Sequence, residues 1–309
     1  MIYDVAIVGG GPAGLSAALL LTRCRRRVAV FDHARPRNYA AHVVNGYLGL
    51  EGMSPAELRA AGRRQIEQYG AELIDSEVTG VRLCPTEFSR FEISIGERAP
   101  LESRKLLLAT GVRDTLPVVE NLAECYGTTV HHCPYCDGWE HREKRLVALG
   151  NADDAAGLAL ALRTWSTQVT ACTNGDKLSA ADSQRLAHNG IAVRLEALVR
   201  LEHREGRVSA VTFSTGPPLA CDAIFFSDSQ TQRSPLPAML GCNFDSKGLI
   251  RTGDKQGTGI DGLFLAGDAD GDVQFAIVAA AEGAIAATAI NRELQEEDCR
   301  LRDDAHCNA

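Results

Sequence analysis

The chain lacks three features: a long hydrophobic run, an excess of positive charge, and the cysteine spacing of a disulfide framework. The apolar run from Leu15 to Leu21 is far shorter than the roughly 20 residues that a membrane-spanning helix requires. The formal net charge of −8 argues against nucleic acid or an anionic membrane as the main partner. The sequence therefore predicts a globular protein that works without nucleic acid and without a membrane.

A secretory signal and low-complexity segments are also missing from the sequence. The chain opens with Met1-Ile2-Tyr3-Asp4 and runs directly into a strand-like segment, so we expect no secretion. It has ten cysteines, eight of them scattered: Cys24, Cys84, Cys125, Cys172, Cys221, Cys242, Cys299 and Cys307. We therefore expect a cytoplasmic protein. In such a reducing compartment, a lone CxxC is more often redox-active or metal-binding than structural.

The other two cysteines lie in the most informative motif, His132-Cys133-Pro134-Tyr135-Cys136-Asp137-Gly138. Two thiols held two residues apart can close, open and exchange a disulfide. Asp137 follows directly and could act as a general acid or base. His131 and His132 make zinc the main alternative, but no second ligand pair stands at a zinc-site spacing. We interpret the motif as redox-active, with both histidines as packing or orienting residues that could assist proton transfer.

The segment from Tyr3 to Asp32 has the pattern of a dinucleotide-binding unit: strand, glycine loop, helix, strand. The loop Gly9-Gly10-Gly11-Pro12-Ala13-Gly14 supplies glycines for a tight turn, for close approach of pyrophosphate and for helix–strand packing. The next helix would face the phosphates with its N-terminus. Asp32 lies where a carboxylate would bind the adenosine ribose hydroxyls. A purely structural glycine turn is the alternative.

A flavin is indicated by Gly267-Asp268, which follows a predicted strand and precedes an alanine-rich helix expected from about Val273 to Leu294. Asp268 could accept a hydrogen bond from a ribityl hydroxyl, or it could only cap the helix. The positive end of that helix, near Val273 and Gln274, could stabilise negative charge on a reduced isoalloxazine.

The second glycine loop, Gly150-Asn151-Ala152, departs from the usual pattern. Alanine stands where close approach to phosphate is needed, and Asp153 and Asp154 place negative charge near the helix start. After the next strand, Cys172-Thr173-Asn174-Gly175-Asp176 offers no arginine cluster for a 2′-phosphate. This site either binds a nicotinamide nucleotide weakly and atypically or is a vestigial scaffold.

The order of elements predicts an α/β fold of two Rossmann-like nucleotide-binding domains, the second inserted into the first. The first domain would take residues 1–115 and 246–309, and the second, residues 116–245, would carry the CxxC. A helix over 54–69, strands over 91–95 and 105–110, and a second strand–helix–strand unit over 146–172 are expected. The charged tail after Glu296 is expected to fray.

Over essentially its whole length, the chain resembles the low-molecular-weight thioredoxin reductase family. The resemblance rests on both glycine loops, the dithiol motif, Ala109-Thr110-Gly111 and Ala266-Gly267-Asp268, in this order and spacing. It implies FAD in the first domain, an inserted NAD(P)-binding-like domain and a homodimer. It also implies that Cys136 is the flavin-proximal thiol, Cys133 the interchange thiol that meets the substrate, and Asp137 the acid/base.

Three departures separate the chain from typical bacterial thioredoxin reductases. Pro134-Tyr135 replaces Ala-Thr between the cysteines, Cys172-Thr173-Asn174 replaces the basic His-Arg-Arg stretch that grips NADPH, and Gln274-Phe275 replaces an Arg-Gln pair near the flavin. The first two resemble the dithiol oxidases that close disulfides in natural products such as gliotoxin, holomycin and romidepsin. Some of that branch have histidine after the second cysteine, whereas this chain retains Asp137.

We therefore expect FAD-dependent oxidation of a small-molecule dithiol through Cys133 and Cys136, with the flavin reoxidised by oxygen or NADP+. The closest alternative is an NADPH-dependent reductase of thioredoxin or another disulfide, which runs the same chemistry in reverse. A non-catalytic flavin redox sensor and a zinc-binding scaffold are further alternatives. A cyclic peptide, a small dithiol and a thioredoxin-like protein all remain candidate substrates.

Overall fold

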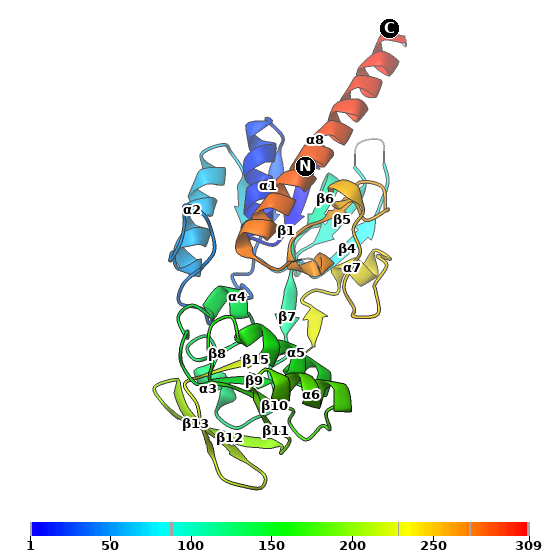
Figure 1. Ribbon diagram of the computed structural model, residues 1–309. Helices are drawn as coiled ribbons and strands as arrows, with labels where there is room; N and C mark the ends of the chain where they lie inside the picture. The colour runs from blue at the N-terminus through cyan, green and yellow to red at the C-terminus, as the bar shows by residue number, and fades with distance from the viewer. Residues whose placement is uncertain (1, 87–88, 228, 272, 308–309) are drawn as a thin grey trace.

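The computed structural model, which describes residues 2–86, 89–227, 229–271 and 273–307, has two main sheets with flanking helices (Figure 1). The larger sheet is mixed, with mostly parallel pairs, and the smaller one is parallel. The larger sheet has the order β3-β2-β1-β6-β5-β4, and β17 also pairs with β6. Its strands are β1 (Ile2–Val8), β2 (Val28–Phe31), β3 (Glu72–Ile74), β4 (Gly80–Leu83), β5 (Phe91–Ser94), β6 (Leu101–Leu108) and β17 (Leu263–Leu265).

The smaller parallel sheet has the order β11-β10-β9-β15-β8 and forms the lower lobe in Figure 1. Its strands are β8 (Val130–His131), β9 (Leu146–Leu149), β10 (Val169–Cys172), β11 (Ala192–Arg194) and β15 (Ala223–Phe226). The antiparallel sheet of this lobe contains β12 (Leu198–Arg204), β13 (Arg207–Phe213) and β14 (Leu219–Ala220). The α/β fold class with Rossmann-like sheets is therefore confirmed.

The chain crosses between the lobes through β7 (Val112–Asp114) and β16 (Gln230–Gln232), which pair antiparallel. The predicted domain boundaries near residues 115 and 246 remain a prediction. The helices are α1 (Pro12–Arg23), α2 (Pro55–Glu67), α3 (Leu122–Cys125), α4 (Pro134–Asp137), α5 (Ala152–Leu162), α6 (Ala180–His188), α7 (Leu236–Met239) and α8 (Ala276–Cys307). Short 3₁₀ turns occupy Asp254–Gln256 and Asp268–Asp270.

Helices α1 and α8 pack closely in the upper lobe (Figure 1). A Cβ added at Gly283 of α8 would stand 2.0 Å from the Ala13 carbonyl oxygen of α1, so only glycine permits this approach. Buried apolar side chains of β1, β2, α1 and α8 share one core here, including Ile7, Leu21 and Ile290. This packing holds the glycine loop, which lies between β1 and α1, in a rigid setting.

The C-terminal helix differs from the prediction at both ends. It begins at Ala276, so Val273 and Gln274 precede the helix instead of forming its first turn. It also continues to Cys307, and the expectation of a frayed tail after Glu296 is wrong. Figure 1 shows this end of α8 projecting from the upper lobe.

Ion pairs explain why the charged end of α8 is ordered near the body. Glu297 pairs with Arg104 at 2.9 Å and with the buried Lys105 at 2.8 Å. Asp298 pairs with Arg26 at 2.6 Å and with Arg104 at 2.8 Å. The acidic side chains that suggested a solvated tail therefore hold α8 against β6 and against the loop that follows α1.

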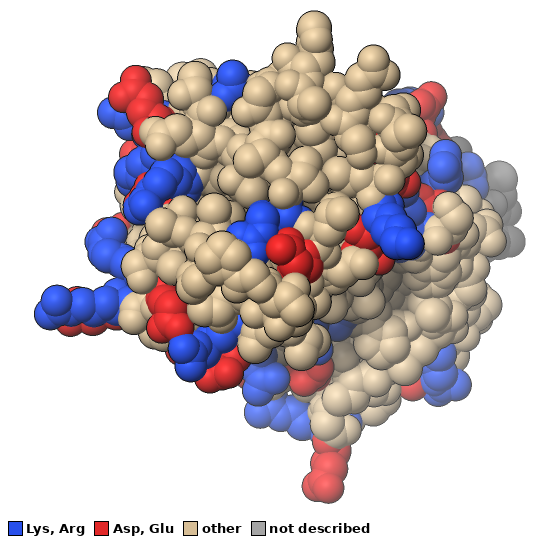
Figure 2. Space-filling view, turned by 60° about the horizontal axis from the view of Figure 1, so that its bottom comes forward, with Lys and Arg blue, Asp and Glu red and all other residues tan. Residues whose placement is uncertain are grey.

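The surface mixes charges of both signs. Figure 2 shows basic and acidic side chains interspersed over the face that it presents, with broad areas that carry neither. Within the part of the chain that the structure describes, none of the helices combines the length and the apolar character needed to cross a membrane.

Candidate active site

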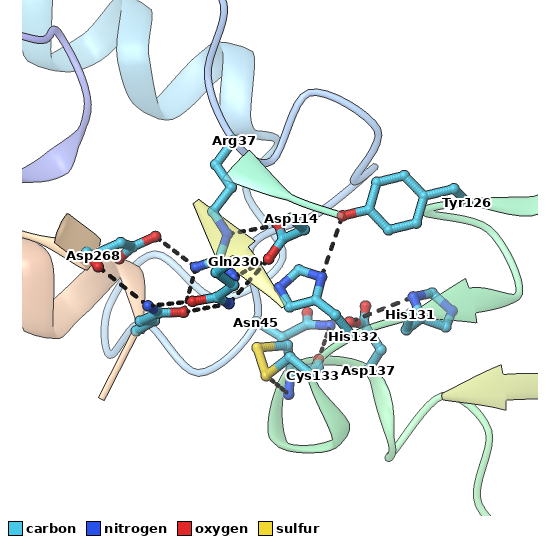
Figure 3. Close-up of a disulfide and its surroundings, with 12 residues drawn as sticks. Arg37, Asn45, Asp114, Tyr126, His131, His132, Cys133, Asp137, Gln230 and Asp268 are labelled. Carbon is cyan, nitrogen blue, oxygen red and sulfur yellow. Dashed lines mark hydrogen bonds and ion pairs between the residues drawn. A yellow bond between two sulfur atoms is a disulfide. The ribbon is translucent and has the colours of Figure 1, made fainter. Parts of the chain in front are cut away.

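Cys133 and Cys136 form a disulfide at the start of the short helix α4 (Figure 3). Cys133 is the N-cap, and its Sγ accepts a hydrogen bond from the Cys136 amide at 3.1 Å. Pro134 takes the first helical position, where its fixed φ suits the helix and its missing N–H breaks no bond. The Asn45 side chain donates to the Cys136 carbonyl at 2.9 Å, so the upper lobe holds this loop in place.

The two cysteines are bonded to each other in this structure, which bears on the zinc alternative. The described residues contain no group of three or more His, Cys, Asp or Glu side chains placed to hold a metal ion. In this structure the pair is a disulfide, the form that an attacking thiolate can open by exchange.

Cys136 and Asp137 line a cavity between the lobes. Most of the residues predicted to bind a nucleotide cofactor also line it. These are Gly9, Gly11, Pro12, Ala13, Asp32, Ala109, Thr110, Gly111, Gly267, Asp268, Gln274 and Phe275. Gly14 lies beneath the loop, where an added Cβ would stand 1.9 Å from the Gly9 carbonyl oxygen. Val273 is not among the lining residues, and it is 53% exposed.

The glycine loop has the geometry that a dinucleotide needs. Gly9 has φ +120°, and a Cβ there would stand 2.1 Å from the Ala109 carbonyl oxygen. At Gly11, no atom of the described residues lies within 4 Å of an added Cβ, so the backbone is open to a ligand. No described side chain caps the N-terminus of α1, which leaves its N–H groups facing the cavity for phosphate oxygens. The buried Thr110 hydroxyl has no hydrogen-bond partner in the described chain.

Asp32 lies at the expected end of β2, 7% exposed, but it already has basic partners. Its carboxylate pairs with Arg59 at 2.8 Å and with Arg63 at 3.4 Å, both from α2. A ribose hydroxyl bound to Asp32 would therefore bind a carboxylate that Arg59 and Arg63 also contact. Sequence reasoning missed these arginines, although their four-residue spacing on a predicted helix places them on one face.

Arg37 links the side chains at the end of the cavity where Asp268 and Gln274 lie (Figure 3). It forms a bidentate ion pair with Asp114 of β7 and a 2.8 Å ion pair with Asp268. It also donates to the Gln274 side chain at 2.7 Å, and Gln230 of β16 bonds both Asp114 and Gln274. A ribityl hydroxyl bound to Asp268 would therefore bind a carboxylate that is also paired with Arg37. Sequence reasoning missed Arg37, Asp114 and Gln230, since nothing local in the sequence pairs them.

The electrostatics of this network follow from its burial. Burial raises the pKa of Asp114, but hydrogen bonding to Arg37, together with the nearby His132 and Gln230, outweighs it, so the net pKa lies below the usual range. His132 lines the cavity, and its Nδ1 lies 3.3 Å from the Tyr126 hydroxyl. Burial lowers the pKa of His132, so its ring is neutral near pH 7. The wall beside the dithiol therefore carries fixed, paired charges.

Asp137 has the electrostatics of an acid/base group. Burial, and then the charge of Glu140, raise the pKa of Asp137 to about 7. Its Oδ2 lies 3.4 Å from Nδ1 of His131, whose imidazole is buried in the lower lobe. A carboxyl that titrates near neutrality can both accept and return a proton beside the dithiol.

Aromatic side chains pack around Tyr135, which lies between the two cysteines in the sequence. Tyr135, between the cysteines, is 74% exposed, and its ring meets Trp165 edge-on at 5.6 Å and Phe275 at 6.3 Å. Gly138 permits this packing, because a Cβ there would stand 2.7 Å from the Trp165 ring. The cluster of Tyr135, Trp165 and Phe275 therefore places apolar rings next to the dithiol motif.

The second glycine loop lines a separate cleft that contains Gly150 and Asn151. Asn151 caps α5 itself, because its Oδ1 accepts from the Asp154 amide at 3.1 Å and its Nδ2 donates to the Asp154 carboxylate at 2.6 Å. Among the described lining residues, the charged ones are Asp154, Asp176 and Lys247. This cleft therefore offers a phosphate one cation and two anions.

Comparisons with known proteins agree with this geometry. A sequence model of the pyridine nucleotide-disulphide oxidoreductase family matches residues 3–283. Thioredoxin reductase tcpT of Claviceps purpurea is 33% identical over 277 residues, 86% of this chain and 86% of that protein. A probable thioredoxin reductase of Arthroderma benhamiae is 30% identical over 327 residues, 96% of this chain and 81% of that protein. The crystal structure of HlmI, 32% identical, has a TM-score of 0.94 and covers 99% of this chain and 98% of its own.

Proposed function

Because the chain belongs to the pyridine nucleotide-disulphide oxidoreductase family, we propose that it is a FAD-dependent oxidase of a small-molecule dithiol. Its relatives establish the class, a thioredoxin reductase-like flavin disulfide oxidoreductase. One observation carries the proposal: the Cys133–Cys136 disulfide stands at a cavity that Cys136, Asp137 and the glycine loop line together. Thiols and a dinucleotide would thus meet in one place.

The cavity residues fit FAD. The open backbone at Gly11 and the uncapped N-terminus of α1 suit a pyrophosphate. The Thr110 hydroxyl, which has no partner in the described chain, could form a hydrogen bond with a polar atom of the cofactor. Asp32 would hold the adenosine ribose, while Asp268 and Gln274 would meet the flavin end. FAD bound there supplies a two-electron acceptor for the dithiol. The protein positions the sulfurs and moves the protons.

In the proposed thiol exchange, a substrate thiolate attacks Cys133 Sγ and releases the Cys136 thiolate. The second substrate thiolate then attacks the substrate sulfur of this mixed disulfide and releases the Cys133 thiolate. The substrate loses two electrons and two protons and becomes a disulfide, and the Cys133–Cys136 disulfide gains the two electrons. Asp137 accepts a proton from a substrate thiol.

The direction of the reaction is argued from the second cleft. Asp154 and Asp176 oppose the 2′-phosphate and pyrophosphate of NADPH, and Lys247 is the one basic residue in the described lining. Because NADP+ carries the same phosphates, we propose oxygen as the terminal acceptor and the oxidative direction. The Tyr135, Trp165 and Phe275 cluster supports an apolar, aromatic small molecule as the substrate, in the manner of natural-product biosynthesis. A cytoplasmic homodimer is part of the proposal.

The test incubates FAD-loaded protein with an aromatic dithiol in air and follows oxygen uptake and product mass. We expect one molecule of O2 to be consumed for each disulfide formed, with hydrogen peroxide as the reduced product. Cys133→Ser should abolish this turnover, and Cys24→Ser, which changes an exposed free thiol, should leave it unchanged. An inactive wild-type protein that instead reduces thioredoxin with NADPH would replace the proposal with the reductase alternative.

A further inference from the structure

Three arginines gather beside the dinucleotide cavity without an acidic partner. Arg35 and Arg233 line the cavity, and Arg113 of β7 lies close enough for its charge to act on Arg233. Within the described residues, no ion pair involves any of the three. Burial, followed by the charges of Arg113 and then Arg35, lowers the pKa of Arg233. A half-buried guanidinium with two like-charged neighbours is unfavourable by itself, so this part of the cavity favours an anion.

The acidic groups near this cluster do not neutralise it. Asp114 also acts on Arg233, but its carboxylate is already held by the bidentate pair described above. Asp32 and Asp268 of the cavity wall are likewise paired with other arginines. Glu77 lines the cavity too, but it is exposed, and water weakens the effect of its charge. The positive charge of the cluster therefore stays available to a bound ligand.

Arg233 is anchored to the segment that contacts the glycine loop. Its amide donates to the Gly111 carbonyl at 3.1 Å, which continues the pairing of β7 and β16. Gly111 follows Ala109 and Thr110, and a Cβ added at Gly9 would stand 2.1 Å from the Ala109 carbonyl oxygen. The cluster and the glycine loop are therefore joined through one short segment, and both line the same cavity.

Two buried polar groups beside Gly111 have no hydrogen-bond partner in the described chain. They are the Thr110 hydroxyl and the Nε–H of Arg233. Thr110 precedes Gly111 in the chain, and Arg233 is bonded to its carbonyl, so the two groups belong to the same corner of the wall. Buried polar groups are nearly always satisfied by protein, water or ligand. A ligand with several acceptor oxygens would satisfy both groups at once.

We propose that Arg35 and Arg233 hold the diphosphate of FAD against the glycine loop. The loop itself has no charged side chain, and the open backbone at Gly11 and the N-terminus of α1 offer only neutral donors. The two guanidinium groups add the positive charge that a doubly charged diphosphate needs. Arg113 is exposed and does not line the cavity, so it adds positive potential without a contact.

This inference rests on the FAD binding that is part of the proposed function, but it does not depend on the substrate or on the direction of the reaction. Arg35 and Arg233 are binding residues for the cofactor and take no part in the thiol exchange at Cys133. Their effect is therefore measured on FAD itself.

The test measures the release of FAD from the purified holoprotein. Arg35→Gln and Arg233→Gln each remove one charge, and we expect the FAD dissociation constant to rise about tenfold in each. Added salt should weaken FAD binding in the wild type, and this salt dependence should be shallower in both variants. Arg98→Gln, which removes an exposed guanidinium outside the cavity, is the matched control and should keep the wild-type affinity and salt dependence.

A charge-retaining variant separates a role in binding the diphosphate from a role in folding. Arg233→Lys keeps the cation but loses the planar fork, so it should bind FAD more weakly and still show the wild-type salt dependence. Arg35 is exposed, so Arg35→Gln and Arg35→Lys carry the same test if the Arg233 variants do not fold.

Two outcomes would overturn the assignment. One is that the glutamine variants keep the FAD affinity and salt dependence of Arg98→Gln. The other is that they keep FAD normally but raise KM only for a dithiol that carries a carboxylate, because the anion would then belong to the substrate. Weakened FAD binding in both variants, together with a wild type that reduces thioredoxin with NADPH, would support this inference and overturn only the oxidase proposal.

Discussion

Arg37 of the upper lobe binds Asp268 at 2.8 Å, although the two residues are 231 positions apart in the chain. The same guanidinium holds Asp114 of the crossover strand β7 in a bidentate pair. Both of its nearest carboxylate partners have little exposure, with side chains 7% and 20% accessible. Arg37 therefore links Asp268 in the cavity wall to β7, the strand that leads into the lower lobe.

Removal of Arg37 should destabilise the protein and weaken its hold on FAD. Arg37→Leu leaves Asp114 and Asp268 without their cation, and loss of one partner from a buried pair costs about 3 kcal/mol. Urea unfolding should report this loss, with flavin release at lower urea. Arg200→Leu is the control, because its pair with Glu202 is exposed and should contribute little to stability. Equal stability of the two variants would contradict the structural role of Arg37.

The acid/base role of Asp137 predicts a pH dependence. The ionised carboxylate accepts the proton, so dithiol-driven flavin reduction should rise with pH through about 7 and fall below it. Asp137→Asn should lower the rate about a hundredfold and remove this transition. Stopped-flow rates from pH 5.5 to about 8.5 would measure it. A variant that retains the transition would assign it to another group.

The same carboxyl should affect stability with the opposite sign. Because its pKa is raised from 3.8 to about 7 in the folded protein, the folded state binds this proton more tightly than the unfolded state. Its stabilising contribution is present below pH 3.8 and is lost as pH rises to about 7. Asp137→Asn should therefore gain stability relative to the wild type over this interval, as thermal unfolding at several pH values would show. A constant difference would contradict the raised pKa.

The aromatic cluster should set the affinity for the substrate. Tyr135→Ala removes edge contacts with Trp165 and Phe275, and aromatic pairs of this kind contribute about 1 kcal/mol. We expect KM for an aromatic dithiol to rise about fivefold with kcat little changed. Trp139→Ala removes an exposed aromatic ring that packs instead against Arg142, and it should leave KM unchanged. An equal rise in both variants would contradict the assignment of the cluster.

The charges of the second cleft should oppose NADPH. Replacement of both Asp154 and Asp176 by asparagine removes two negative charges, each worth about 1 kcal/mol against a nearby phosphate. The half-saturating NADPH concentration for flavin reduction should therefore fall about thirtyfold. Asp182→Asn, on α6 outside the cleft, is the control and should have no effect. A double variant with wild-type NADPH dependence would show that these carboxylates do not face the nucleotide.

Local patterns were sufficient to predict the elements that local interactions stabilise. Ser54 and Glu57 form the capping box that begins α2, as the sequence from Ser54 onward predicts. Gly14 makes the close approach to Gly9 that the glycine spacing implies, because this contact lies within the loop and the start of α1. The dithiol motif likewise forms its disulfide within four residues.

Long-range pairing was beyond prediction from the sequence. The ordered end of α8 depends on Arg26, Arg104 and Lys105, which are far away in the chain. The Arg37 network likewise depends on how β7 and β16 are brought beside the upper sheet. Single-sequence patterns record spacing along the chain, and none of these pairs has a distinctive spacing.

The most direct test of the central claim is anaerobic stopped-flow of the bound flavin against an aromatic dithiol and against NADPH. The account predicts that the dithiol bleaches the flavin in wild type but not in Cys133→Ser, and that NADPH bleaches it slowly and weakly in both. Chemical reduction of the flavin should be the same in both proteins. Rapid, tight bleaching by NADPH, with no response to the dithiol, would contradict the account.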